Sequence, residues 1–434
     1  MHVSDFEKGQ SVESAINNLS EVEKEIRIKV TAGELHPHFE KAYRRFQPKL
    51  QLKGFRKGKV PLDIVKKMYA EQIEYDSLDV IATEIYRDIA KEKSIQPVGE
   101  PVLTDIDYKR GDSLEFKVKY EILPEIDVKG YKGITVEKPI HAVTEKEIED
   151  EILRIRRSNA TTEEAQSVDS DEYVVTADVQ ELDDTGFPII GKRSEHQRYY
   201  LGDENLDPEF RSALRSATTG SPVRIKYESR HGDHTHPINV QATATKIEKV
   251  ILPDVTDEFV KKVTKEKTGT VSEFMQNLRN DIENYWKDRT ERRLADAIAS
   301  EIIRKHDFAV PETLVISIIN RQIEDLKTRF PKKQLPADFD ENKYREEMRP
   351  SAIWQAKWFL IRERIIEKEG IDVDEAALAN LAEEKSKQTG IEKEKLLEFF
   401  KNSEETRRQL LSDKLITFLK SKAKITEKVT EEFF

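Results

Sequence analysis

The chain has 434 residues, of which 36% are charged and 37% hydrophobic, and its formal net charge is −11. This length suffices for about three domains, and the high charged content indicates an extended protein with a large surface. The acidic balance argues against binding nucleic acid over the whole surface, and the absence of cysteine excludes disulfides, thiolate metal sites and cysteine nucleophiles.

The first part of the chain has the pattern of a mixed α+β unit. Residues 21–30 alternate apolar and charged side chains, which predicts a half-buried strand. A helix is expected from about residue 37 to residue 49, with Phe39, Tyr43 and Phe46 on one face. Apolar residues spaced from Ile64 to Ile89 predict two more helices, and residues 101–108 and 113–123 predict paired strands.

A glycine-flanked basic segment, residues 54–61, lies between these helices. Gly54 and Gly58 allow backbone angles that other residues avoid, so the segment is expected to form a projecting tip. The tip has three positive charges and one aromatic side chain, Phe55, with no periodic pattern around it that would bury it. Across residues 41–67, Asp63 is the one acidic residue among ten basic ones, namely Lys41, Arg44, Arg45, Lys49, Lys53, Arg56, Lys57, Lys59, Lys66 and Lys67. Such a patch attracts phosphates in a salt-sensitive way, although an ordinary solvated loop is the alternative interpretation.

The middle of the chain begins with an extended connector over residues 124–143. Thr144 with Glu147 three residues later predicts a capping box and a helix, and residues 158–171 are polar enough for a linker. Strands are expected at residues 173–179, 223–227 and 238–247, with one short helix at 208–214. This pattern predicts a small antiparallel sheet that packs on a helix.

From Leu252 onward the apolar residues recur every three or four positions, which predicts helices to the end of the chain. Pro311 is expected to begin one of these helices, and residues 331–336 to form a loop between two of them.

The tip provides a family resemblance. Six positions match the pattern Gly-Phe-Arg-x-Gly-Lys-x-Pro, at Gly54, Phe55, Arg56, Gly58, Lys59 and Pro61. This pattern resembles the ribosome-docking loop of the trigger factor family, bacterial chaperones that work where nascent chains emerge, and the resemblance extends over nearly the whole chain. It implies a multidomain α+β fold with a ribosome-binding domain at 1–123, a connector and linker helix at 124–168, an FK506-binding-protein-like domain at 169–250 and an all-α chaperone domain with arm-like projections at 251–434.

The resemblance also implies partners. The large ribosomal subunit near the exit tunnel, both protein and rRNA, is expected to bind Gly54, Phe55, Arg56, Lys57, Gly58, Lys59 and Pro61. Nascent and unfolded polypeptides are expected in a helical cradle, with Ile316, Ile323, Phe330, Trp354 and Phe400 as candidate contacts. The polar first residues and the lack of long apolar runs predict no secretory signal, no membrane partner and a cytoplasmic location. Whether two copies form a homodimer is left open.

Residues 169–250 occupy the position of the family's prolyl isomerase domain. The resemblance assigns Phe187, Tyr199, Leu206 and Phe210 to its pocket. However, Val179 and Gln197 stand where aromatic residues are expected, Pro188 replaces an acidic residue, and Asp207-Pro208-Glu209-Phe210 replaces Ile-Pro-Gly-Phe. Two carboxylates at an apolar pocket would be costly to bury. We therefore expect weak or absent isomerase activity and an auxiliary peptide-binding role, with an active peptidyl-prolyl isomerase as the alternative.

Neither a cofactor nor a metal is expected. The sequence has no glycine-rich phosphate loop, serine elbow or His-Glu-x-x-His motif, which disfavours ATP-driven chaperoning. His231, His234 and His236, with Asp233, have a spacing that three metal ligands can have, but a polar loop is the preferred interpretation. A ribosome-associated scaffold that binds no clients is the third functional alternative.

Overall fold

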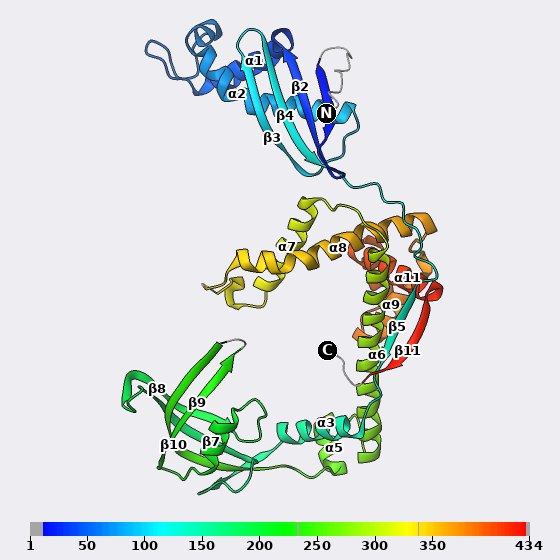
Figure 1. Ribbon diagram of the computed structural model, residues 1–434. Coiled ribbons are helices and arrows are strands. Elements are labelled where there is room, and N and C mark those ends of the chain that lie inside the picture. Colours follow the sequence, from blue (N-terminus) through cyan, green and yellow to red (C-terminus); the bar gives the residue numbers. More distant parts are fainter. Residues whose placement is uncertain (1–11, 232–233, 337, 431–434) are drawn as a thin grey trace. The chain divides into compact units, whose positions relative to one another are not determined.

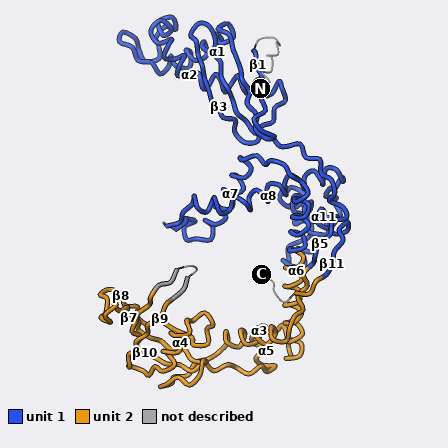
Figure 2. Tube along the Cα trace, in the orientation of Figure 1, with its two compact units in different colours: residues 1–138, 292–427 blue, residues 139–291, 428–434 orange. Residues whose placement is uncertain are grey.

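The computed structural model describes residues 12–231, 234–336 and 338–430, and the side chains of residues 229–236 lie outside the described part. The chain divides into two compact units (Figure 2). Unit 1 comprises residues 1–138 and 292–427, and unit 2 comprises residues 139–291 and 428–434. Helices and antiparallel strands occur in both units, which confirms the predicted multidomain α+β class. The finer domain boundaries stay predictions.

Unit 1 begins with a four-stranded antiparallel sheet in the order β1-β2-β4-β3. Its strands are β1 (Glu13–Asn18), β2 (Glu23–Thr31), β3 (Val98–Lys109) and β4 (Ser113–Glu121). Helices α1 (Ala32–Phe46) and α2 (Leu62–Glu92) cover one face of this sheet (Figure 1). The predicted strand at 21–30 is confirmed as β2, because its alternating apolar side chains, among them Ile26 and Ile28, are buried beneath the helices.

The prediction of two helices between Ile64 and Ile89 was wrong, because α2 is one continuous helix. No glycine or proline interrupts residues 62–92, so no local signal ends the helix. Val65, Ile73, Leu78 and Ile85 are buried along its length. Met68 is 56% exposed and lies outside this core.

The rest of unit 1 is mainly helical. It contains the C-terminal part of α6 (Val271–Arg304), α7 (Glu312–Lys327), α8 (Glu341–Glu369), α9 (Glu375–Thr389), α10 (Lys393–Asn402) and α11 (Glu404–Lys422), with the short 3-10 turn η2 (Pro331–Lys333) after α7. A second 3-10 turn, η1 (Gln47–Lys49), follows α1. In its core Tyr131 and Ile134 of the connector pack with Ile298 of α6 and Leu415 of α11.

The prediction that everything after Leu252 is helical was wrong at the end of the chain. Residues Lys424–Val429 form strand β11, which pairs with β5 (Thr135–Ile140) of the connector. The backbone N–H of Lys424 donates to the carbonyl of Ile134 at 2.7 Å. Only Ile425 and Val429 of these six residues are apolar, and the whole strand is exposed, so no apolar alternation indicates a strand here.

Unit 2 contains α3 (Glu145–Ser158), a five-stranded sheet, α4 (Pro208–Arg215), α5 (Asp257–Thr264) and the N-terminal part of α6. The strands are β6 (Thr161–Ala165), β7 (Tyr173–Leu182), β8 (Pro188–Tyr200), β9 (Pro222–His231) and β10 (His234–Ile251). The order is β6-β10-β7-β8, and β9 also pairs with β10. The core combines Val175, Leu201 and Ile247 with Leu214 of α4.

Two features of unit 2 test the expectations for this region. The capping box at Thr144 is confirmed, since Thr144 Oγ1 accepts from the Glu147 N–H at 3.3 Å and the Glu147 carboxylate accepts from the Thr144 N–H at 2.8 Å. The linker expected at 158–171 is in part a strand, because β6 pairs with the end of β10. Its residues are mostly exposed and polar, so no apolar alternation indicates a strand.

Candidate functional site

The segment between α1 and α2 forms a tight, hydrogen-bonded tip. The Phe55 N–H donates to the Leu52 carbonyl at 3.0 Å, and the Gly58 N–H donates to the Leu50 carbonyl at 3.0 Å. Gly54 and Gly58 have φ angles of +96° and +75°, where a side chain would be strained. A Cβ on Gly58 would also lie 3.1 Å from the Pro48 carbonyl oxygen. The predicted turn therefore needs both glycines.

The base of the tip is fixed to the body of unit 1. Val60 is fully buried, and its carbonyl accepts a hydrogen bond from Gln47 Nε2 at 2.6 Å. Pro61 is the residue just before α2, and its carbonyl accepts the first hydrogen bonds of that helix. The tip is thus a preformed projection between two packed helices.

The aromatic and basic side chains of the tip face solvent. Phe55 is 38% exposed, and Arg56, Lys57 and Lys59 are exposed as well. Within the described part of the chain, none of these four side chains has a hydrogen bond or an ion pair with another residue. One aromatic ring and three cations are therefore presented together and remain open to a partner.

The basic surface extends from the tip onto α1. Lys41, Arg44 and Arg45 are exposed on the last turns of α1, and Lys49, Lys53 and Lys67 are exposed near the tip. Lys66 is different, because its ammonium pairs with Glu40 and lies 5.7 Å from the centre of the Tyr43 ring. Hydrogen bonding to Lys66, together with the nearby charges of Lys66, His36 and Arg44, lowers the pKa of Glu40 despite its partial desolvation. Lys66 therefore stabilises the helix pair rather than adding an open charge.

Glu74 of α2 fastens the elements that support this surface. Its carboxylate accepts hydrogen bonds from the hydroxyls of Tyr43 and Tyr108 at 2.5 and 2.9 Å, and from Arg110 Nε at 2.8 Å. Burial by itself raises the pKa of Glu74, but these hydrogen bonds outweigh burial and hold the pKa below its usual range. One carboxylate thus ties α2 to α1, to β3 and to the turn after β3.

The five-stranded sheet of unit 2 and α4 bring together three of the four residues that were expected to form a pocket. Leu206 packs against the same core as Tyr199 and Phe210. The rings of Tyr199 and Phe210 are 4.9 Å apart, and the ring of Tyr227 lies 6.4 Å from Phe210. Burial raises the pKa of both tyrosines, so their hydroxyls stay protonated. Sequence reasoning missed Tyr227, which is a third aromatic residue of this cluster.

Phe187 does not join that cluster. It is 70% exposed and lies in the turn between β7 and β8, and Ile190 at the start of β8 is fully exposed. The turn is well ordered by Asp183, whose Oδ1 accepts from the N–H groups of Thr185 and Phe187, each at 2.9 Å. The structure therefore places Phe187 at a hairpin tip rather than in the aromatic pocket.

The two carboxylates that distinguish this pocket sit near its edge. Asp207 Oδ1 caps α4 by accepting from the N–H groups of Glu209 and Phe210 at 2.9 and 3.2 Å. Glu209 is exposed. The desolvation cost expected from the sequence is therefore largely avoided. Burial is the main cause of the raised pKa of Tyr227, and the charges of Asp207 and Glu209 raise it further.

The candidate client contacts of the helical part differ in how far their side chains are exposed. Ile316 is 43% exposed, whereas Ile323 is 2% exposed and belongs to the core between α7 and α8. Phe330, Trp354 and Phe400 are half-buried. Trp354 Nε1 donates to Ser300 Oγ at 3.2 Å, and Phe400 contacts the 65% exposed ring of Phe399 at 5.8 Å.

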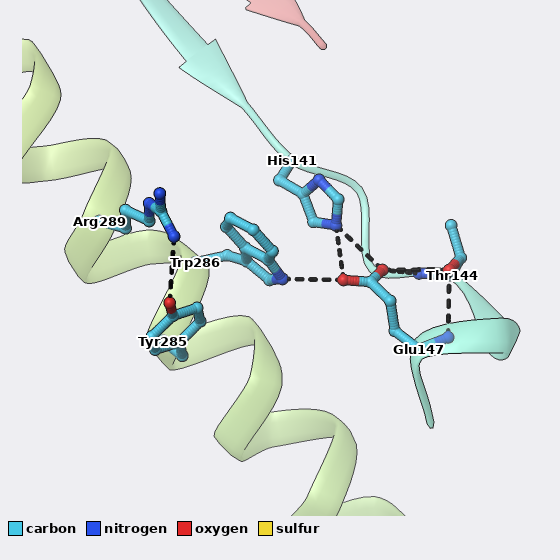
Figure 3. A network of polar contacts seen from close by, with 6 residues as sticks. All are labelled: His141, Thr144, Glu147, Tyr285, Trp286 and Arg289. Carbon is cyan, nitrogen blue, oxygen red and sulfur yellow. Dashed lines mark hydrogen bonds and ion pairs between the residues drawn. The ribbon is translucent and has the colours of Figure 1, made fainter. Parts of the chain in front are cut away.

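Sequence reasoning missed a polar network that joins the connector to α3 and α6 within unit 2 (Figure 3). Glu147 Oε1 accepts from Trp286 Nε1 at 3.0 Å and contacts His141 Nε2 at 2.8 Å, while the His141 ring stacks on Trp286 at 4.1 Å. Burial by itself raises the pKa of Glu147, but hydrogen bonds from Thr144, His141 and Trp286 lower it further than burial raises it. These residues are far apart in sequence, so only the capping-box part could be found from a local pattern.

The side chains of His231, His234 and His236, and the whole of Asp233, lie outside the described residues. Among the residues that are described, no group of three or more His, Asp or Glu side chains is arranged to hold a metal ion. In the same part of the chain, no helix has the length and apolar character needed to cross a bilayer.

Comparison with known proteins matches both ends of the chain to one family. Residues 12–155 match the model described as "Bacterial trigger factor protein (TF)", and residues 270–421 match the model of its C-terminus. The trigger factor of Chloroherpeton thalassium is 31% identical over 428 residues, which covers 95% of this chain and 97% of the relative. The chain belongs to the trigger factor family.

The chain is also similar to other proteins. The trigger factor of Salinibacter ruber is 27% identical, with 97% of this chain and 96% of the relative covered. A solved structure described as "Promiscuous Substrate Recognition in Folding and Assembly Activities of the Trigger Factor Chaperone" covers 93% of this chain and 98% of its own chain, at 19% identity and a TM-score of 0.47. The comparisons thus identify the same family whose docking loop the motif at residues 54–61 resembles.

Proposed function

We propose that this trigger factor family member is an ATP-independent chaperone that docks on the large ribosomal subunit near the exit tunnel, in the cytoplasm, and shields nascent or unfolded polypeptides. The tip at 54–61 is the docking site. Exposed apolar side chains of the helical part, such as Ile316 and Phe399, are the client contacts.

The main support is that the charged and aromatic side chains of the tip are exposed and unpaired, while the base of the tip is fixed to the body of unit 1. Arg56, Lys57 and Lys59 have no partner within the described residues, and Phe55 is exposed beside them. Cations that are free to pair with phosphates release counterions from RNA, which makes docking favourable and salt-sensitive. An aromatic ring adds a contact to protein or to an unstacked base. The chain as a whole has a net charge of −11, so attraction to the ribosome has to be local.

The test is ribosome co-sedimentation of the triple variant Phe55→Ala/Arg56→Ala/Lys57→Ala. We expect the variant to be lost from the ribosome pellet, while wild-type binding weakens progressively as the salt concentration rises. Suppression of the aggregation of a denatured model protein should stay close to wild type, because the tip is remote in sequence from the helical client contacts.

The matched control removes two exposed cations elsewhere, in Lys261→Ala/Lys262→Ala on α5. It should pellet with ribosomes like the wild type. Undiminished pelleting of the tip variant would refute docking through the tip. If the wild-type chain docks but fails to suppress aggregation, the scaffold alternative without clients is favoured.

For the isomerase-like domain we propose a peptide-binding role with weak or absent catalysis. Rotating an X-Pro bond crosses a barrier of about 18–20 kcal/mol. An enzyme lowers this barrier by holding the proline ring in a dry pocket. Here the aromatic cluster of Tyr199, Phe210 and Tyr227 is flanked by Asp207 and Glu209.

The measurement is a protease-coupled assay on a prolyl peptide, with an FK506-binding protein of known activity as reference. We expect a rate far below the reference, and binding of an unfolded proline-containing protein that persists without turnover. A rate similar to the reference would instead establish the active isomerase.

A further inference from the structure

Unit 1 contains a cavity that the proposed function does not use. It lies between the C-terminal half of α2 and the sheet, and its volume is about 440 Å³. Its lining includes Ala90, Ile95, Pro97, Pro101, Leu103 and Val118. A mainly apolar cavity of this size with a few polar groups is typical of a site for a small molecule.

One of the polar groups in the lining has no partner. Tyr86 is 5% exposed, and its buried hydroxyl makes no hydrogen bond within the described part of the chain. Burial raises the pKa of Tyr86 to about 12, so at neutral pH the hydroxyl keeps its proton and can donate. Buried polar groups are nearly always satisfied in folded proteins, so this hydroxyl marks a place where an acceptor is missing.

The lining also contains two adjacent cations. Arg87 and Lys91 are four residues apart on α2, so their side chains lie on the same face of the helix. Both are exposed, and neither has an ion pair or a side-chain hydrogen bond among the described residues. Glu100 is the acidic residue of the lining, so the positive charges outnumber the negative one.

We propose that this cavity binds a small apolar carboxylate, that is, a hydrocarbon tail with one anionic head, as in a medium-chain fatty acid. The tail covers the apolar lining and displaces water from it. The carboxylate pairs with Arg87 and Lys91 by charge-assisted hydrogen bonds. Protein atoms cover the Tyr86 hydroxyl in the free chain, and on binding its side chain shifts so that the hydroxyl donates to one carboxylate oxygen. Neither a neutral nor a cationic head satisfies all of these groups.

The experiment uses the full chain and three probes with the same tail, namely decanoate, decanol and decyltrimethylammonium, all below their micelle-forming concentrations. Isothermal titration should show decanoate binding at least tenfold more tightly than decyltrimethylammonium. Arg87→Ala/Lys91→Ala should weaken decanoate binding by roughly tenfold, the factor expected for a lost hydrogen bond to a charged group. The control Lys261→Ala/Lys262→Ala should bind decanoate as the wild type does.

Two further measurements locate the site. Tyr86→Phe should leave the free protein at least as heat-stable as the wild type, since it removes an unsatisfied hydroxyl, yet should bind decanoate more weakly. A decanoate analogue with a photoreactive diazirine on its tail should label peptides within residues 83–118. Equal binding of the three probes, wild-type decanoate affinity in both cavity variants, or labelling confined to other regions would each overturn the proposal.

Discussion

At the scale of single residues, Glu74 shows how a buried carboxylate can be stabilising. Three donors from α1, β3 and the following turn meet its two oxygens, and its residue is 7% exposed. A buried charge is tolerated when hydrogen bonds replace its lost hydration. No local sequence pattern indicated this role, because its partners are Tyr43, Tyr108 and Arg110, more than thirty positions away along the chain.

We predict that Glu74→Gln destabilises unit 1 by about 1–3 kcal/mol, because it weakens hydrogen bonds to a charged group and leaves a buried hydroxyl poorly satisfied. Urea unfolding at pH 7, followed by circular dichroism, measures this loss. Glu71→Gln is the matched control, since Glu71 lies one turn away on α2, is 72% exposed and approaches the same Arg110 at 3.9 Å. A control as destabilised as Glu74→Gln would contradict the special role of Glu74.

The same carboxylate gives a pH dependence with a defined sign. The folded-state pKa of Glu74 is lowered, so its contribution to stability is fully present above the ordinary carboxyl pKa of about 4.3. That contribution is lost as the pH falls below this value and through the lowered folded-state pKa. The stability difference between wild type and Glu74→Gln should therefore shrink as the pH is lowered from about 5 to about 3. A difference that is constant over this range would contradict the prediction.

At the scale of elements, α4 shows what Asp207 contributes to the fold. The family resemblance leads one to expect an apolar residue at this position, and here Asp207 caps the first turn of the helix. Its charge also lies at the positive end of the helix dipole. The substitution therefore has a structural use, whatever it does to catalysis.

We predict that Asp207→Ala destabilises unit 2 by about 0.5–2 kcal/mol, the usual range for a lost N-cap. Differential scanning calorimetry of the full chain should show the transition that belongs to unit 2 at a lower temperature. Glu204→Ala removes an exposed carboxylate three residues earlier and should leave that transition in place. An unchanged transition in Asp207→Ala would show that the cap adds no measurable stability.

The elements that the sequence predicted correctly are those with a local physical signal. Strand β2 alternates, α3 has its capping box, and the tip has two glycines at the required positions. Strand β8 was missed because nearly all of its residues are exposed at the edge of the sheet, so it has no apolar alternation. The cavity around Tyr86 and the network at Glu147 depend on tertiary contacts, and only the fold could reveal them.

At the scale of the whole molecule, the sequence of unit 2 interrupts that of unit 1. The α/β part of unit 1 is built from residues that are close in sequence, since its core runs from β2 to β4. The helical core is different, because Val128 and Ile134 of the connector pack with Leu415 and Leu419 of α11.

The pairing of connector and α11 sets an order of events during synthesis. Chains are made from the N-terminus at about 5–20 residues per second, and domains tend to fold as units once they are complete. The sheet with its basic tip can fold early, and the inserted domain next. Val128 and Ile134 cannot complete their packing before α11 has been made, so the helical core closes late, about 280 residues of synthesis after the connector. The chain that we propose to bind unfinished chains thus exposes an apolar segment of its own, the connector, until α11 has been made.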